Sequence, residues 1–325
     1  MVLAHTVEDR LDVMRAAILT AYGQPPQPGD FENPAPGNGQ VEVEVLAAGL
    51  NPVDIAMASG TFYGGAPPLP SVVGREGVGR LPDGRRAYFD GPVAPFGSMA
   101  ERALIDPQSA IPLPDGLDEG VATGLGIAGL AAWLSLEWRA RVQEGETVLV
   151  LGASGVVGQV GVQAARLLGA ARVVAAARSR EGLERARELG ADATVRLDQE
   201  EDLAEALRSA CAGGADVVVD PLWGEPAAAA VEAMRPGGRL VQIGQSAGER
   251  SSILSSAVRG SMLSILGHTN FAAPLEVKRA AYTRMAEHAA ARELRLEVER
   301  VGLEDVGEAW ARQQAGPQRK LVVVP

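Results

Sequence analysis

The amino-acid sequence predicts an α/β protein that combines a doubly wound parallel sheet with a second, mostly β domain. The first observation is an apolar run at residues 147–151, followed at once by three spaced glycines and an amphipathic helix. The second is a regular alternation of strand-like and helix-like segments from residue 147 to about residue 267. The third is a series of short strands and turns before about residue 120.

The strand, turn and helix at residues 147–169 form the central unit of this prediction. A β-branched and aliphatic run such as 147–151 is typical of a strand buried on both faces. Gly152, Gly155 and Gly158 follow it in the pattern G-x-x-G-x-x-G. We expect the first glycine to permit a tight turn, the second to let the backbone approach a pyrophosphate, and the third to let helix and strand pack closely.

A pyrophosphate would lie at the start of this helix, where unpaired amides and the helix dipole favour an anion. The same spacing also fits a close-packed turn that binds no ligand. The residues predicted to bind the pyrophosphate are Gly152, Ser154, Gly155, Val156, Val157 and Gly158.

After this unit, strands and helices continue in alternation, as expected for right-handed crossovers in a parallel sheet. Ligands of such sheets bind outside the carboxyl ends of the strands, which points to the turns that follow them. We predict further strands at 172–177, 193–195, 216–220, 239–244 and 261–267, with helices at 180–189, 203–211 and 226–234 between them.

The flanking sequence predicts the second domain. Residues 1–13 look like an extension, and residues 25–36 and 50–73 look like loops because prolines and glycines interrupt them. Alternating polar and apolar residues at 40–49 predict a half-buried antiparallel strand.

The remaining segments complete both domains. Residues 118–142 predict a helix with glycines near its start, which leads into the parallel-sheet domain. At the end of the chain, two more helices are expected at 275–293 and 302–314. The strand 320–324 is expected to return to the β domain, because it does not continue the alternation. The predicted domains are therefore 1–121 with 271–325, and 122–270.

Composition excludes several classes of protein. A net charge of −11 argues against a nucleic-acid partner, whose phosphates need a basic face. The single cysteine, Cys211, excludes an internal disulfide and is best explained as a small buried residue. No unbroken apolar run of about 18 residues occurs, so we expect a cytoplasmic protein without a membrane partner.

The residues after the second strand predict the cofactor. An acidic side chain at this position would bind the ribose hydroxyls of NAD, whereas this chain has Arg178, Ser179 and Arg180. Guanidinium groups suit a 2′-phosphate, so we predict NADPH. The alternative is that both arginines belong to a solvated helix start.

Four motifs together identify a family. They are residues 48–54 (Ala-Gly-Leu-Asn-Pro-Val-Asp), 74–79 (Gly-Arg-Glu-Gly-Val-Gly), the glycine turn, and 237–244 (Gly-Gly-Arg-Leu-Val-Gln-Ile-Gly). With them the chain resembles the medium-chain dehydrogenase/reductase superfamily, in particular its zinc-free quinone oxidoreductase branch, which includes zeta-crystallin. The resemblance implies a GroES-like β domain, a Rossmann domain, NADPH in the cleft between them, and a homodimer paired through the strand 261–266.

The resemblance also implies the chemistry. Zinc enzymes of this superfamily have a cysteine at the position of Asn51 and a histidine at the position of Arg75. An amide and a guanidinium cannot replace these zinc ligands, so we expect no metal ion in this protein. The expected reaction is hydride transfer from the nicotinamide to a quinone or to the β-carbon of an α,β-unsaturated carbonyl compound. A non-catalytic NADPH-binding protein (crystallin-like or a sensor) and a zinc-free alcohol dehydrogenase are the alternatives.

By the same resemblance, two residues of the first domain would position the substrate. They are Asn51, which equally suits a turn former before Pro52, and Tyr63, for which Phe62 is a rival. Asp54 would hold this loop. The residues expected at the nicotinamide and its ribose are Gln245, Ser246, His268, Thr269 and Asn270, with His268 as a hydrogen-bonding residue rather than a catalytic acid.

Overall fold

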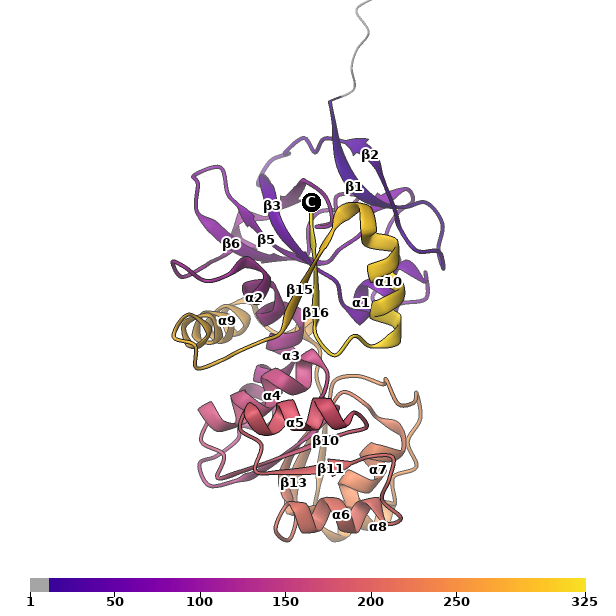
Figure 1. Cartoon of the computed structure of the whole chain (residues 1–325), viewed down its shortest axis with the longest axis vertical. Helices are drawn as coiled ribbons and strands as arrows, with labels where there is room; N and C mark the ends of the chain where they lie inside the picture. The colour runs from indigo at the N-terminus through magenta and orange to yellow at the C-terminus, as the bar shows by residue number, and fades with distance from the viewer. Residues whose placement is uncertain (1–11) are drawn as a thin grey trace, which may run out of the picture. The chain divides into compact units, whose positions relative to one another are not determined.

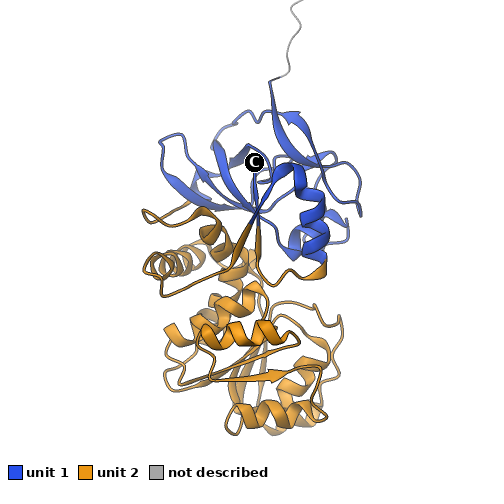
Figure 2. Cartoon of the chain, in the orientation of Figure 1, with its two compact units in different colours: residues 1–110, 300–314, 322–325 blue, residues 111–299, 315–321 orange. Residues whose placement is uncertain are grey.

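The computed structural model describes residues 12–325, which fold into two compact units (Figure 2). Unit 1 holds the described residues up to Ala110, together with Arg300–Gln314 and Val322–Pro325. Unit 2 holds Ile111–Glu299 and Ala315–Leu321. The predicted N-terminal extension lies outside the described residues, except for its last two positions.

Unit 2 is built on a six-stranded parallel sheet in the order β11-β10-β9-β12-β13-β14. Its strands β10, β11 and β13 are labelled in Figure 1. The predicted doubly wound fold is therefore confirmed. Its strands are β9 (Thr147–Leu151), β10 (Arg172–Ala177), β11 (Ala193–Arg196), β12 (Ala215–Asp220), β13 (Met234–Gln242) and β14 (Ser264–Gly267). The helices between them are α4 (Val156–Leu167), α5 (Arg180–Glu188), α6 (Leu203–Ala210), α7 (Gly224–Glu232) and α8 (Ser255–Gly260).

The central strands lie in the core because both of their faces are apolar. All five residues of β9 are buried, and Leu149 and Leu151 belong to a cluster that also contains Leu207 of α6. Side chains cap two of the helices that lie between the strands: Ser179 accepts an amide in the first turn of α5, and Asp202 accepts one in the first turn of α6. Propensity, periodicity and capping thus agree over this unit.

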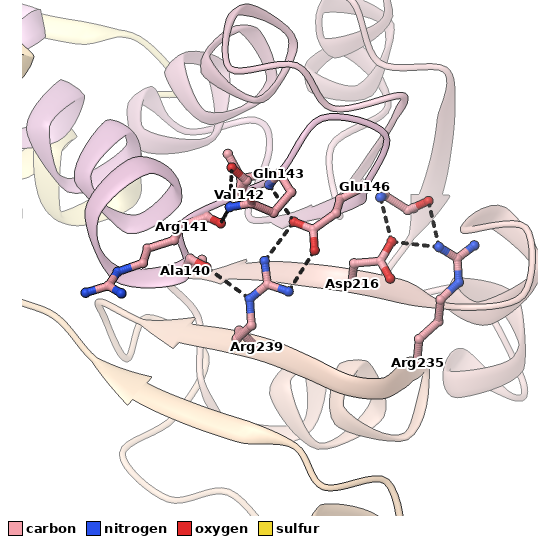
Figure 3. A network of polar contacts seen from close by, with 9 residues as sticks. Ala140, Arg141, Val142, Gln143, Glu146, Asp216, Arg235 and Arg239 are labelled. Atoms are coloured by element: carbon pink, nitrogen blue, oxygen red, sulfur yellow. Dashed lines mark hydrogen bonds and ion pairs between the residues drawn. The ribbon is translucent and has the colours of Figure 1, made fainter.

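The amino end of β9 is held by ionic groups (Figure 3). Arg239 of β13 donates from both terminal nitrogens to the carboxylate of Glu146, at 2.8 and 2.7 Å. Arg235 and the amide of Thr147 both donate to Asp216 Oδ2, at 2.6 and 2.7 Å. These bonds tie the starts of β9, β12 and β13 together, at the opposite end from the glycine turn.

A long helix precedes this sheet. Glu119–Ala140 comprises α2 (Glu119–Gly124), η2 (Leu125–Gly129), α3 (Leu130–Leu134) and η3 (Ser135–Ala140). Among the described residues it is the helix that is long and apolar enough to cross a membrane, and 78% of its most apolar window is buried, as in a core helix. The Tyr282 hydroxyl of α9 (Leu275–Ala290) donates to the carbonyl of Ala122 in it.

Most of the antiparallel strands belong to unit 1. The first sheet has the order β2-β1-β4, with β1 (Val13–Leu19), β2 (Gln27–Glu32) and β4 (Ser71–Val72). The second has the order β15-β16-β3-β5-β6-β8, and β7 also pairs with β3. Its strands are β3 (Val41–Gly49), β5 (Glu76–Arg80), β6 (Arg86–Asp90), β7 (Arg102–Ile105), β8 (Ile111–Pro112), β15 (Val298–Gly302) and β16 (Lys320–Val324). Two helices, α1 (Pro52–Ala58) and α10 (Val306–Ala315), accompany them.

The return of the last strand is confirmed, because Val322 and Val323 of β16 pair with Gly49 and Ala48 of β3. The predicted domain boundaries at 121/122 and 270/271 differ from those of the compact units, which divide at 110/111, 299/300, 314/315 and 321/322.

Three local predictions are wrong in part. Residues 27–32 form β2, an edge strand, where proline and glycine are tolerated because one side of the strand needs no partner. Residues 52–58 form α1, since Pro52 suits the first position of a helix and Asn51 caps it. The strand expected from residue 261 begins at Ser264, because α8 runs to Gly260.

Candidate functional site

The glycine turn between β9 and α4 has the geometry that its spacing predicts. Gly152 has a φ of +62°, a left-handed conformation that favours glycine. A Cβ atom on Gly158 would lie 2.4 Å from the Cα of Ala153, so this glycine lets helix and strand approach closely. Gly152 and Gly158 thus have the backbone conformation and the packing that we predicted for them.

Gly155 differs from both of these glycines. It precedes α4 with an ordinary φ of −80°, and a Cβ atom on it would meet only the carbonyl oxygen of Gly152, at 3.6 Å. Neither backbone strain nor crowding in the protein therefore requires a glycine here. The space at Gly155 adjoins the first turn of α4, where Val156 and Val157 present amides without an intrahelical acceptor.

The end of β10 carries the predicted basic group. Arg178 is exposed, and its positive charge helps to lower the pKa of Asp198, after the larger effects of Arg196. Arg180 donates to Glu184 at 3.1 Å, one turn later in α5, so its charge is partly compensated. Ser179 accepts the first-turn amide of α5 at 3.0 Å and keeps its hydroxyl proton for another acceptor.

The end of β12 contains a buried carboxyl group, that of Asp220, in one of the strand-end turns to which the sequence pointed without assigning this group a role. Asp220 Oδ1 accepts the amides of Leu222 and Trp223, each at 2.9 Å, and its Oδ2 is buried without a hydrogen-bond partner among the described residues. Burial raises the pKa of Asp220, and the two amides offset part of that effect. An acidic residue at the end of a buried apolar strand was the available signal for such a group.

The ends of β13 and β14 carry the residues expected at the nicotinamide. Gln245 and Ser246 are exposed, and the Ser246 hydroxyl donates to the carbonyl of residue 221 at 3.2 Å. His268 Nε2 lies 3.0 Å from Asn270 Oδ1, and the Asn270 side-chain amide donates to the carbonyl of residue 127 at 2.8 Å. Thr269 caps the short helix η4 (Asn270–Ala272).

His268 is a poor candidate for a catalytic acid. Burial lowers its pKa below the ordinary value, while the bond to Asn270 opposes that shift. The ring therefore favours the neutral form near neutral pH, in keeping with a hydrogen-bonding role.

In unit 1, Asn51 is fixed by its neighbours. It forms a capping box with Asp54 at the start of α1, and its own amide donates to Asp54 Oδ2 at 2.8 Å. Its side-chain nitrogen donates to Glu76 Oε1 at 2.8 Å, and Tyr88 donates to the other oxygen of Glu76 at 3.0 Å. Glu76, a fully buried acidic side chain, is a further residue that sequence reasoning missed.

Asp54 holds this segment, because its Oδ1 accepts the amide of Arg75 at 2.9 Å. The Arg75 guanidinium lies 3.2 Å from Asp90. A cavity of about 70 Å³ beside them is lined mainly by apolar groups, together with Asp54, Arg75 and the buried Ser71.

Tyr63 lies apart from this group. It is 80% exposed, and its ring lies against that of Phe62 with 4.4 Å between the ring centroids and a tilt of 44° between the ring planes. It does not line the cavity beside Arg75. The structure thus brings Asn51, Asp54 and Glu76 together, without Tyr63.

Comparison with known proteins identifies the family. The quinone oxidoreductase of Rattus norvegicus is 32% identical over 245 residues, which cover 71% of this chain and 73% of the rat protein. The chain belongs to the medium-chain dehydrogenase/reductase superfamily, in its quinone oxidoreductase-like branch. The family model described as zinc-binding dehydrogenase matches residues 156–286, within unit 2.

Other proteins extend the comparison. A mycocerosic acid synthase-like polyketide synthase of Mycobacterium tuberculosis is 32% identical over 226 residues, 66% of this chain, and the chain spans only 10% of that protein's length. The quinone oxidoreductase of Thermus thermophilus, whose crystal structures include its complex with NADPH, has a TM-score of 0.81 and 29% identity. That likeness covers 96% of this chain and 100% of the Thermus chain.

Zinc-binding members of the superfamily differ at the positions noted above. In this chain Asn51 is bonded to Glu76, and Arg75 lies against Asp90. Within residues 12–325, no three His, Cys, Asp or Glu side chains gather closely enough to hold a metal ion. Cys211 is buried, which raises the pKa of its thiol to about 12 and makes it unreactive near neutral pH.

Proposed function

We propose that this protein is an NADPH-dependent oxidoreductase that transfers hydride to quinones or α,β-unsaturated carbonyl compounds without a metal ion. The observation that carries the proposal is the open space at Gly155, between the left-handed turn at Gly152 and the close packing at Gly158. The likeness to the rat quinone oxidoreductase and to the Thermus enzyme, which was crystallised with NADPH, supports it.

The cofactor would be held by the carboxyl ends of the strands in unit 2. The first-turn amides and the dipole of α4 would bind the pyrophosphate, at the turn shaped by the three glycines. The exposed Arg178 would bind the 2′-phosphate together with Ser179. Arg180 would contribute less to this contact because it is paired with Glu184.

The remaining positions would serve the nicotinamide and the substrate. The bound cofactor supplies the hydride. The side chain of Asn51, whose orientation the capping box and Glu76 set, would position the substrate or cofactor, and Tyr63 would contact the substrate. The residues that would contact the nicotinamide and its ribose are Gln245, Ser246, His268, Thr269 and Asn270.

No Lewis acid is needed for this reaction. A quinone or enone spreads the negative charge that hydride addition creates, so solvent or a hydroxyl group can return the proton. Alcohol oxidation would instead need a group that stabilises an alkoxide, and an amide at position 51 with a guanidinium at position 75 offers no zinc ligand. Positioning would therefore supply most of the acceleration.

Steady-state kinetics test the proposal. We expect NADPH oxidation, faster than NADH oxidation, with 1,2-naphthoquinone, 9,10-phenanthrenequinone or a simple enone. Arg178→Asp should reverse this preference, because a carboxylate repels the 2′-phosphate and accepts bonds from the free ribose hydroxyls of NADH. Arg187→Asp is the matched control, since Arg187 lies about two helical turns after Arg180 in α5 and its guanidinium donates to Thr194.

Other outcomes would refute parts of the proposal. Unchanged NADPH affinity in Arg178→Asp contradicts the proposal that Arg178 binds the 2′-phosphate. Tight NADPH binding with no turnover across the panel favours the non-catalytic alternative, and alcohol oxidation that chelators abolish favours a metal enzyme.

We also propose a cytoplasmic homodimer that pairs through β14, with no membrane or nucleic-acid partner. Among the described strands, β14 pairs only with β13, which leaves its other edge open. Ile265 on this strand and Met262 just before it are exposed, Met262 by 75%. Open edges that carry apolar residues are suited to strand pairing across a twofold axis.

A further inference from the structure

The turn after β12 contains a backbone conformation that only glycine adopts readily. Trp223 has φ 56° and ψ −155°, a region that is almost exclusive to glycine, and the next residue, Gly224, has a φ of +64°. A tryptophan is the bulkiest side chain that this position could carry. Its presence needs an explanation in packing or in ligand binding.

Several hydrogen bonds hold the conformation. Asp220 Oδ1 accepts the amides of Leu222 and Trp223, each at 2.9 Å. From the other side, the amide of Ala247 donates to the carbonyl of Leu222 at 2.8 Å, and the hydroxyl of Ser251 donates to the carbonyl of residue 224 at 2.6 Å. The turn is therefore held on both sides, and the backbone of Trp223, from which the indole projects, is fixed before any ligand arrives.

This turn lies against the glycine turn. β12 and β9 are neighbours in the sheet, with Val219 paired to Val150 near their carboxyl ends. A Cβ atom on Gly152 would lie 3.1 Å from Pro221 Cγ and 3.1 Å from Leu222 Cδ2. Trp223 thus follows directly on the residues that adjoin the place proposed for the pyrophosphate.

The strand order decides which half of the dinucleotide passes this turn. β10, with Arg178 at its end, lies on one side of β9, and β12, β13 and β14 lie on the other side. A dinucleotide whose 2′-phosphate is at Arg178 and whose pyrophosphate is at Gly155 must therefore extend its nicotinamide half over β12. This is the point at which the strand order reverses, where doubly wound sheets bind their ligands.

The indole is only half-buried. It packs with Leu222 against the apolar cluster of the sheet, while part of its surface stays exposed. Packing in the core therefore accounts for one part of the ring and leaves the other part for a ligand.

Trp223 is the aromatic side chain of the turn after β12. Residues 243–248, which follow β13, contain no aromatic side chain, and the segment after β14 carries His268 and the exposed Phe271. At the point where the strand order reverses, between β9 and β12, a flat conjugated ring would therefore find its large apolar contact at position 223.

We propose that Trp223 is an aromatic contact for the nicotinamide half of the dinucleotide, and this inference rests on the proposed function. An indole that keeps part of its surface exposed can stack on, or lie edge-on against, a flat conjugated ring such as nicotinamide. Trp223 would therefore contribute to affinity for the nicotinamide half and leave the adenosine half unaffected.

The test uses isothermal titration calorimetry on the full chain with NADPH and with adenosine 2′,5′-bisphosphate, which lacks the nicotinamide half. Trp223→Ala should weaken binding of NADPH by about tenfold, as expected for a lost aromatic contact. Binding of adenosine 2′,5′-bisphosphate should stay within about twofold. Quenching of tryptophan fluorescence by NADPH should also shrink in this variant.

Two further variants separate ring contact from core packing. Trp223→Phe keeps an aromatic face and Trp223→Leu keeps apolar volume, so thermal unfolding of the two should be similar. Phe should retain most of the affinity for NADPH, and Leu should lose it severalfold. This comparison decides the question even where Trp223→Ala does not fold.

Equal NADPH affinity of the Phe and Leu variants, or wild-type affinity in Trp223→Ala, would overturn the assignment of Trp223. A loss that is equally large for adenosine 2′,5′-bisphosphate would overturn it as well, because the indole would then serve the other half. These results leave the proposed function intact, provided that the wild-type protein binds NADPH. A wild-type protein that binds neither compound refutes the proposed function itself.

Discussion

Gly155 and Gly158 lie about one helical turn apart, yet replacement by alanine should weaken NADPH binding at Gly155 and lower the stability of the fold at Gly158. At Gly155 the new methyl group meets only the Gly152 carbonyl oxygen at 3.6 Å, an ordinary contact, and the φ of −80° is allowed for alanine. Alanine is a poorer helix-capping residue than glycine, which destabilises the fold, but it also reduces the conformational freedom of the unfolded chain, which stabilises the fold. These effects nearly cancel, so the free energy of unfolding should change by less than about 1 kcal/mol.

The same methyl group would occupy the space proposed for the pyrophosphate. Losing one charge-assisted hydrogen bond to a phosphate costs about 1.5–3 kcal/mol, which corresponds to roughly a 10- to 150-fold loss of NADPH affinity. Gly155→Ala should therefore be a folded protein that binds NADPH poorly.

At Gly158 the methyl group would lie 2.4 Å from the Cα of Ala153 and 2.5 Å from the carbonyl oxygen of Gly152. These are backbone atoms, so the start of α4 must move away from β9. Overpacking of this kind costs about 1–3 kcal/mol or more, which lowers the midpoint of thermal unfolding by several degrees. Gly158→Ala should therefore be destabilised even without ligand.

Thermal unfolding followed by circular dichroism, together with calorimetric titration of NADPH, measures both effects. Gly260→Ala is the control, because a Cβ atom at that position meets no other atom within 4 Å and α8 lies outside the proposed site. Gly155→Ala with wild-type NADPH affinity would refute the assignment of Gly155 to the pyrophosphate. Gly158→Ala with wild-type stability would contradict the inferred effect of the close contact.

Further predictions concern stability and assembly. Burial opposes ionisation of Glu146, but the hydrogen bonds from Arg239 outweigh burial and lower the pKa of the Glu146 carboxyl group. The stability that this pair adds is therefore present above about pH 4.3, the ordinary pKa of a glutamate, and is lost as the pH falls. Glu146→Gln should cost about 2 kcal/mol in urea unfolding at pH 7, and an unchanged value there would contradict this. Asp54→Ala removes the acceptors of two backbone amides and should cost a similar amount in the same assay. Because burial lowers the pKa of His268, the folded state binds fewer protons there, so stability should decrease as the pH falls below about 6.5, and His268→Gln should reduce that slope. Ile265→Lys on the open edge of β14 should convert a dimer to monomers in multi-angle light scattering, and a wild-type monomer would refute the proposed pairing.

Local sequence patterns determined the fold class and the centre of the candidate site. The buried run before Gly152 and the glycine spacing up to Gly158 are contiguous in the chain. Gly152 is required by the left-handed backbone of the turn, and Gly158 by its close contact with Ala153, so both requirements are local. Arg178 and Ser179 were found in the same way, because the end of a parallel strand follows directly from the alternation of strands and helices. The edge strand β2 and the helix α1 were not predicted, because the prolines and glycines in these segments indicate a loop unless the neighbouring strands are known.

Contacts between distant residues were decided by the tertiary structure alone. Asn51 and Glu76 are 25 positions apart, and only the packing of unit 1 shows that the amide of one donates to the buried side chain of the other. The strain at Trp223 likewise depends on segments near Ala247 and Ser251, which no local pattern connects. A sequence determines periodicity and the freedom of each residue, whereas hydrogen bonds across the fold determine which side chains are fixed and which are left for a ligand.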